Sequence, residues 1–187
     1  PKSGEVSSGY RESGYYSEAF INMLALLGWN PGTEQEIFSM EELIEAFSFE
    51  HCTKSGARFN VDKTKWFNHE YLLKKSKEEV GEEYLQWLET EKGIKADKDY
   101  VVKVTGLVKD RVNFVSELWE QVNFFFVAPT EYDEKSLKKR WKEESPKHMT
   151  EMLSLLEAHE DWSAEGLDNL IMPWIAEKEY GVGIVMN

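Results

Sequence analysis

The side chains that best suit a chemical task in this sequence are the cations of its middle third. Residues 51–111 carry 13 basic and 11 acidic side chains, whereas the whole chain of 187 residues has 22 Lys and Arg against 35 Asp and Glu. Guanidinium forks and ammonium groups are the groups that bind base edges and phosphates of single-stranded RNA. The candidates are Lys54, Arg58, Lys63, Lys65, Lys74, Lys75, Lys77, Lys103, Lys109 and Arg111. The overall net charge of −13 argues against a general nucleic-acid coat protein, but it leaves room for a local RNA-binding face.

Arg111 is the candidate with the most specific position. It lies near the junction of two predicted helices, where an arginine projects from a helix end and presents several donors to a base edge. A surface ion pair with Asp110 or Glu117 is the alternative, and the pattern alone leaves both open. A second short basic run, residues 138–140, is a further candidate for phosphate contact.

The remaining chemical groups predict no catalytic residue and no metal site. His51 and Cys52 are adjacent, so their side chains tend to diverge, and His69 lacks the second histidine that a zinc-protease helix needs four residues later. His148 and His159 lie about three helical turns apart, too far to share an ion. No acidic pair stands out for acid–base catalysis, and no glycine pattern fits a phosphate loop. We expect no cofactor on this chain.

Helical periodicity dominates the elements that must position these cations. Serine or aspartate caps precede several apolar stripes, as in the capping box of Ser39 and Glu42, at Ser76, and at Asp97 or Asp99. The predicted helices are 15–27, 39–47, 61–72, 76–92, 97–108, 113–126, 137–141, 145–156 and one from 163 that Pro173 kinks or interrupts. The only strand candidate is the weak stretch 100–104. The sequence therefore predicts an all-α fold of consecutive helical bundles.

Two of these helices carry specific predictions about burial. In helix 113–126 the stripe consists of Phe114, Leu118, Val122 and Phe125. In helix 61–72 the inward residues are Val61, Trp66 and either Tyr71 or Leu72. Trp119 is expected in the core.

Composition shifts near residues 73–78 and 128–133 predict three lobes. These are 1–72, with a flexible Ser- and Gly-rich start at 1–9, then 73–130, and then 131–187. The chain opens on proline instead of methionine, and we expect it to be part of a longer protein. The longest apolar runs are far shorter than the ~18 residues that span a bilayer. A single cysteine excludes an internal disulfide and favours the cytoplasm.

The stretches Tyr15–Trp29, Glu36–Leu43, Lys54–Phe59 and Lys65–Asn68 together resemble one family, the bacterial-type glutamyl-tRNA synthetases. Tyr15–Trp29 looks like the helix that follows the family's ATP-site lysine motif, and Glu36–Leu43 like the next helix entry. Lys54–Phe59 and Lys65–Asn68 resemble the following loop and helix, while residues 73–187 match more loosely. The resemblance implies a helical stem-contact domain followed by a helical anticodon-binding region. It also implies that the full-length enzyme, with ATP and Mg²⁺, ligates glutamate to tRNA(Glu), whereas this chain carries no catalytic residue.

The resemblance also implies roles for single residues. Arg111 falls where many members have an arginine that reads the last anticodon base, and its donors would face the O2 and N3 acceptors of cytosine. Lys103 and Lys109 would then contact phosphates, and Lys54 and Arg58 the inner corner of the tRNA. The expected partner is tRNA(Glu), with no DNA and no membrane, and the chain is expected to be a monomer. The alternative is an all-α protein-interaction module without RNA binding.

Overall fold

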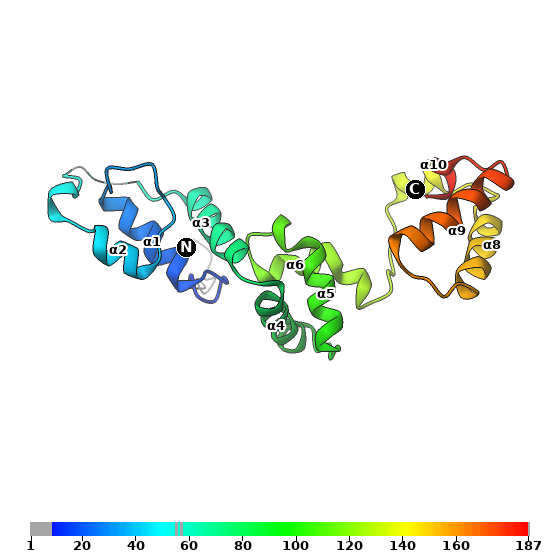
Figure 1. Ribbon diagram of the computed structural model, residues 1–187, viewed down its shortest axis with the longest axis horizontal. Coiled ribbons are helices and arrows are strands. Elements are labelled where there is room, and N and C mark those ends of the chain that lie inside the picture. The colour runs from blue at the N-terminus through cyan, green and yellow to red at the C-terminus, as the bar shows by residue number, and fades with distance from the viewer. Residues whose placement is uncertain (1–8, 55, 57, 187) are drawn as a thin grey trace, which may run out of the picture. The chain divides into compact units, whose positions relative to one another are not determined.

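A computed structural model describes residues 9–54, 56 and 58–186, and Figure 1 labels its α-helices except α7. The predicted flexible start lies, apart from Gly9, outside the described residues. Within them the regular elements are all helical, with one isolated antiparallel bridge between Trp29 and Cys52. The predicted all-α fold is confirmed. The chain separates into unit 1, Pro1–Ala128, and unit 2, Pro129–Asn187. The three-lobe division stays a prediction.

Unit 1 contains most of the helices, and their starts follow local capping chemistry. Ser39 and Ser76 each form a complete capping box, with Glu42 and Glu79, and Asp97 accepts the N–H of Tyr100. The elements are α1 Ser17–Gly28, α2 Met40–Ala46, η1 Phe49–His51, α3 Val61–Lys74, α4 Lys77–Trp87, the π-helical η2 Leu88–Lys92, α5 Lys98–Val108, η3 Lys109–Arg111, η4 Val115–Glu117, α6 Leu118–Val122 and η5 Asn123–Phe125.

The predicted continuous helix over 113–126 is wrong. The segment is broken into η4, α6 and η5, and Phe114 before it is extended, with φ −135° and ψ 148°. The Oε2 of Glu117 accepts the backbone N–H groups of Asn113 at 2.7 Å and Phe114 at 3.3 Å, and these bonds hold the extended entry to η4. Phe125 is 38% exposed, so it does not belong to the buried stripe, whereas Leu118 and Val122 are fully buried.

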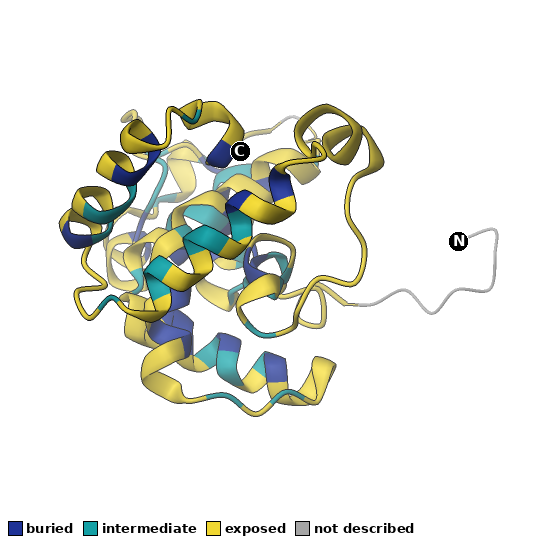
Figure 2. Ribbon diagram, turned by 90° about the vertical axis from the view of Figure 1, so that its right-hand side faces the viewer, coloured by how far each residue is buried: buried dark blue, intermediate teal, exposed yellow. Residues whose placement is uncertain are grey.

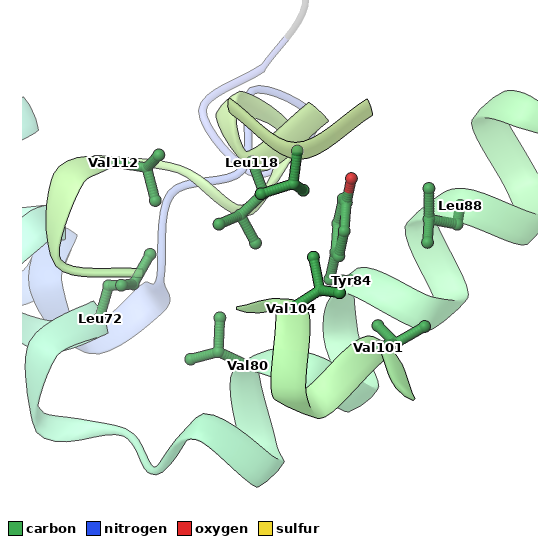
Figure 3. Packing of buried hydrophobic residues seen from close by; sticks show 9 residues of the cluster. Leu72, Val80, Tyr84, Leu88, Val101, Val104, Val112 and Leu118 are labelled. Carbon is green, nitrogen blue, oxygen red and sulfur yellow. The ribbon is translucent and has the colours of Figure 1, made fainter. Parts of the chain in front are cut away.

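The main core of unit 1 lies between the end of α3, α4, α5 and the segment 112–122. Its buried side chains converge in Figure 3 and are Leu72, Val80, Tyr84, Leu88, Val101, Val104, Val112, Leu118 and Val122. Smaller clusters join α1 to α3 through Met23 and Phe67, and surround Trp29.

The predicted inward face of helix 61–72 needs a correction. Val61 and Trp66 are exposed, because the helix turns Phe67 and Asn68 inward instead, whereas Leu72, one of the two predicted alternatives, is buried. These three residues recur at helical spacing, which fits one buried face.

Unit 2 is smaller and has its own core. It comprises α7 Glu134–Arg140, α8 Ser145–Glu157, α9 Ala164–Glu177 and α10 Val182–Val185. Trp174, Ile175 and Val185 form the buried centre, and Figure 2 shows that most other residues are exposed or intermediate. Helix α9 starts at the predicted cap, Ser163, and continues past Pro173. No described helix of either unit is long and apolar enough to cross a membrane.

Candidate nucleic-acid interface

The turn that carries Arg111 follows directly from the end of α5 and is bound to the end of α3. Lys109 donates from Nζ to the backbone carbonyls of Lys75 at 2.7 Å, Leu73 at 3.1 Å and Leu72 at 3.5 Å. The last carbonyls of a helix lack intrahelical partners and carry partial negative charge, so a lysine suits them. Lys109 thus caps α3, and a phosphate contact by this side chain would compete with three acceptors.

Two side chains of α3 hold the other end of the same turn. Asn68 is fully buried, accepts the N–H of Tyr16 at 2.8 Å and donates to the carbonyl of Asn113 at 2.6 Å. His69 lies with Nδ1 2.8 Å from the carbonyl of Val112, and because a carbonyl only accepts, Nδ1 carries the proton. The segment 109–113 is therefore tied to α3 on both sides of Arg111.

A third tie joins the start of α1 to α4. The hydroxyl of Tyr16 donates to Glu83 at 2.7 Å, and Lys75 binds the same carboxylate at 2.9 Å while lying over the Tyr16 ring. Burial raises the pKa of Tyr16, and its bond to Glu83 raises that pKa further, so the hydroxyl stays a donor. These contacts hold the start of α1 and the residue that follows α3 against α4.

Arg111 itself is exposed at the end of η3. In the part of the chain that the structure describes, it forms no ion pair with Asp110 or Glu117, the two partners considered from the sequence. Glu117 is occupied by the backbone N–H groups of Asn113 and Phe114. The guanidinium is thus free for another acceptor while its backbone is held in place.

The other candidate cations divide into paired and free ones. Lys63, Lys75 and Lys77 form ion pairs with carboxylates. Lys103 on α5 is exposed, and among the described residues it forms no ion pair. The structure brings Lys109 and Arg111 together on η3, the turn that follows the helix of Lys103.

Lys54 and Arg58 are both exposed in the loop before α3. Arg58 lines a cavity of about 70 Å³ over Met23 and Phe67. The two residues thus belong to a different segment of unit 1 from the Arg111 turn.

Sequence reasoning missed the roles of His69 and Glu117. Nothing in the local sequence signals that His69 meets a carbonyl 43 residues away. The spacing of Glu117, three residues after Phe114, is that of a capping box, but the serine or threonine that usually marks one is replaced by phenylalanine. Nowhere in the described ranges do three His, Cys, Asp or Glu side chains gather as metal ligands.

Comparison with protein families gives the class of this fold and site. Residues 72–187 match the family described as "Anticodon binding domain", and residues 3–66 match "tRNA synthetases class I (E and Q), catalytic domain". The chain therefore belongs to the family of anticodon-binding domains.

The whole chain is similar to glutamate–tRNA ligases. It is 58% identical over 187 residues to that of Phocaeicola vulgatus and 48% identical to that of Porphyromonas gingivalis. It covers 37% of the length of each of these relatives.

Two solved structures are similar as well. A glutamate tRNA ligase from Elizabethkingia meningosepticum, solved in complex with its amino acid, matches with a TM-score of 0.88 at 39% identity, over 99% of this chain and 36% of that one. A glutamate–tRNA synthetase from Elizabethkingia anophelis gives 0.82 at 38% identity, over 100% of this chain and 36% of that one.

Proposed function

We propose that this chain is the tRNA-binding part of a glutamate–tRNA ligase and binds the anticodon arm of tRNA(Glu). The family match over residues 72–187 supports the class of partner. The observation that carries the proposal is Arg111, an exposed guanidinium without an ion pair in the described chain, on a turn tied to α3 by Lys109, Asn68 and His69.

In this proposal Arg111 reads the last anticodon base. A guanidinium only donates, so cytosine, with acceptors at O2 and N3, fits it, whereas the Watson–Crick edge of guanine adds opposing donors. Lys103 binds a phosphate from the exposed side of α5. Lys54 and Arg58 contact the inner corner of the tRNA. Lys109 does not contact the RNA in this proposal. It holds the turn of Arg111 in place by binding the protein backbone at the end of α3.

The complete protein, in our proposal, ligates glutamate to tRNA(Glu) with ATP and Mg²⁺ in the cytoplasm and acts as a monomer. This chain contributes tRNA binding to that reaction. We assign none of its residues to ATP, Mg²⁺ or the chemical step.

The test is binding of the chain to a labelled anticodon arm of tRNA(Glu) over a salt series, with the last anticodon base as cytosine or guanine. Arg111→Ala should weaken binding of the cytosine arm by about 1–3 kcal/mol, by analogy with base readout in DNA, and should abolish the preference over guanine. Lys103→Ala is the matched control, since a phosphate contact weakens both arms equally and lowers the salt slope by roughly 0.7–0.9.

Equal binding of both arms by the unsubstituted chain would remove the base-reading role of Arg111. An absence of any salt-sensitive binding would contradict tRNA binding by this chain.

A further inference from the structure

An exposed apolar surface lies on α2 and η1 of unit 1, and the proposed role of Arg111 does not use it. Met40, Ile44 and Phe47 recur at the spacing of one helical face and are 40%, 72% and 46% exposed. Phe49 on η1 is 83% exposed, and its ring packs edge-on against that of Phe47, with the centroids 5.3 Å apart. These four side chains form what we call the α2 surface. Grouped apolar side chains that stay exposed mark a site where another molecule binds.

The α2 surface is held in place by buried packing and backbone bonds. Trp29 is only 4% exposed, and the centroid of its ring lies 6.0 Å from that of Phe47. After η1 the chain is bound to the end of α1, because Thr53 donates to the carbonyl of Gly28 from its N–H at 2.9 Å and from its hydroxyl at 3.0 Å. Side chains that are already positioned lose less conformational freedom on binding, so more of the apolar contact contributes to affinity.

The charges around the α2 surface are all acidic. Residues 12–53 contain eight glutamates and no lysine or arginine. Glu41, Glu45 and Glu50 are exposed, and none of them forms an ion pair in the described ranges. Hydrogen bonds from the backbone and from neighbouring serine hydroxyls hold the pKa of Glu41 and of Glu50 below its ordinary value, so both stay ionised. Such a surface repels phosphates and attracts cations.

A cavity of about 320 Å³ lies on the other side chain neighbours of Trp29, between the end of α1 and the loop before α2. Its lining includes Trp29, Glu34 and Thr53. Lys63 lines it too, but this lysine is paired with Glu36, whereas Glu34 has no ion pair within the described residues. Lysine and arginine combine an apolar stem with a charged head, so a cavity with an indole and a free carboxylate suits one of them.

We propose that the α2 surface docks a basic amphipathic helix of another protein. The apolar face of that helix packs on Ile44, Phe47 and Phe49, and its lysines or arginines face the surrounding glutamates, with one of them in the cavity beside Trp29. Helices that lay an apolar face on an apolar surface are a common mode of peptide recognition, and complementary charge selects the partner. This inference goes beyond tRNA binding and does not depend on it.

The charges decide against two other occupants of the α2 surface. RNA would bring phosphates to a surface that has glutamates and no lysine or arginine. A second copy of this chain would place the same glutamates on both sides of a symmetric interface, where like charges oppose association. A basic partner satisfies both the apolar side chains and the acids.

The experiment uses three labelled helical peptides of equal length and measures their binding to the full chain by fluorescence anisotropy. The first carries leucines on one face and lysines on the other. The second keeps the leucines and replaces the lysines with glutamates, and the third keeps the lysines and replaces the leucines with glutamines. The chain should bind the leucine–lysine peptide more tightly than either of the others.

Truncation of the apolar side chains tests the location. Phe49→Ala and Ile44→Ala should each weaken binding of the leucine–lysine peptide by about 5- to 30-fold, the usual effect of removing a central contact of an interface. Leu153→Ala is the matched control, because Leu153 is 56% exposed on α8 of unit 2 and should leave binding unchanged. Thermal melts establish that each variant remains folded.

Charge is tested in the same way. Glu45→Gln should weaken binding of the leucine–lysine peptide by about 2- to 5-fold at low salt, and the difference should vanish at high salt because exposed charges are screened. Glu165→Gln, which removes an exposed carboxylate of unit 2, should have no such effect.

Equal binding of all three peptides, or unchanged binding in both Phe49→Ala and Ile44→Ala, would overturn the inference. Three further results would assign the α2 surface to another occupant. Self-association that Phe49→Ala abolishes in sedimentation would identify a second copy, and loss of binding to the anticodon arm in the same variant would identify RNA. Failure of the leucine–lysine peptide to bind the Phocaeicola vulgatus ligase with this chain in place of its matching part would show that the longer protein covers the surface itself.

Discussion

The two units differ in the buried polar side chains that join their segments. In unit 1, Asn22 and Asn68 are fully buried and join separate segments, as when the Oδ1 of Asn22 accepts from Phe38 at 2.9 Å and from Tyr71 at 3.0 Å. In unit 2, the buried His148 packs on Tyr180 with the two ring centroids 4.0 Å apart, and its Nδ1 has no hydrogen-bond partner in the described chain. Four buried side-chain atoms of unit 1, among them the Nδ2 of Asn22, have no partner there either. Directional bonds in a low-dielectric interior specify one geometry, whereas ring packing tolerates several.

The bonds of unit 1 match the task that we propose for it. Reading a base edge requires donors at fixed positions, and the Arg111 turn is bound to α3 by three side chains. The following predictions test how much the hydrogen bonds and close packing of unit 1 contribute to its unfolding free energy.

Asn68→Ala should have the largest effect. It leaves the N–H of Tyr16 and the carbonyl of Asn113 without their partner, and each unsatisfied buried group costs about 1–3 kcal/mol. We expect unit 1 to lose about 2–5 kcal/mol of unfolding free energy. Amide hydrogen exchange, which resolves the two units, measures this loss. The control is Asn60→Ala, an exposed helix cap whose removal costs about 1 kcal/mol. Equal losses for both variants would contradict the special role of Asn68.

Gly81→Ala tests the close approach of α4 and α5. An added Cβ would lie 2.7 Å from Cγ2 and 3.0 Å from Cα of Val102, so the helices must move apart at a cost of about 1–3 kcal/mol. Gly106→Ala on α5 is the matched control. Its Cβ would meet only the flexible side chain of Lys77, and alanine adds helix propensity worth about 0.5–1 kcal/mol. Urea unfolding should therefore move in opposite directions for the two variants.

Lys109→Ala separates a structural lysine from a phosphate-binding one. It removes three bonds to the end of α3, and we expect a loss of about 1–2 kcal/mol in the stability of unit 1, together with a weaker preference of Arg111 for cytosine. Lys103→Ala should leave stability unchanged and lower only the salt slope. A salt slope reduced by Lys109→Ala with no change in stability would show that Lys109 binds phosphate instead.

Local signals explain what could be predicted from the sequence. Caps depend on residues within one helical turn, and those at Ser39 and Ser76 are confirmed. Of the alternatives Asp97 and Asp99 the structure uses Asp97, and within the predicted cap 161–163 it uses Ser163. The error over residues 113–126 concerns the continuity of the helix. Phe114, Leu118 and Val122 are buried as the stripe predicts, but they are carried by an extended residue and a series of short helices.

The position of one site residue could also be predicted from local sequence signals. The position of Arg111 at a helix junction followed from the pattern. Its freedom from Glu117 and the role of Lys109 did not, because Lys109 bonds to carbonyls 34 to 37 residues away. Contacts at that separation depend on how α3 and α5 pack, which no local window of sequence contains.

The residue in a left-handed conformation that follows α9 can be compared with a residue in the same conformation in unit 1, and the expected difference in stability is small. Glu179 has a φ of 57° and completes a Schellman motif, in which Tyr180 donates to Ile175 and Glu179 donates to Ala176. In unit 1 the corresponding position, after η2, is Gly93 with a φ of 67°. A left-handed residue with a Cβ costs roughly 1–2 kcal/mol, and the greater freedom of glycine in the unfolded chain offsets about 0.4–1 kcal/mol.

Glu179→Gly should therefore stabilise unit 2 by about 0.5 kcal/mol, which corresponds to a rise of roughly 2–4 °C in its melting temperature. Gly93→Ala should destabilise unit 1 by a similar amount through backbone strain alone, because no neighbouring atom lies within 4 Å of the added Cβ. Thermal melts with unit-resolved hydrogen exchange measure both changes. A lower melting temperature for Glu179→Gly would mean that the glutamate side chain stabilises unit 2 by more than its left-handed backbone costs. The stability of unit 2 would then also depend on a polar side chain. The two units would differ less in their dependence on polar side chains than their buried residues indicate.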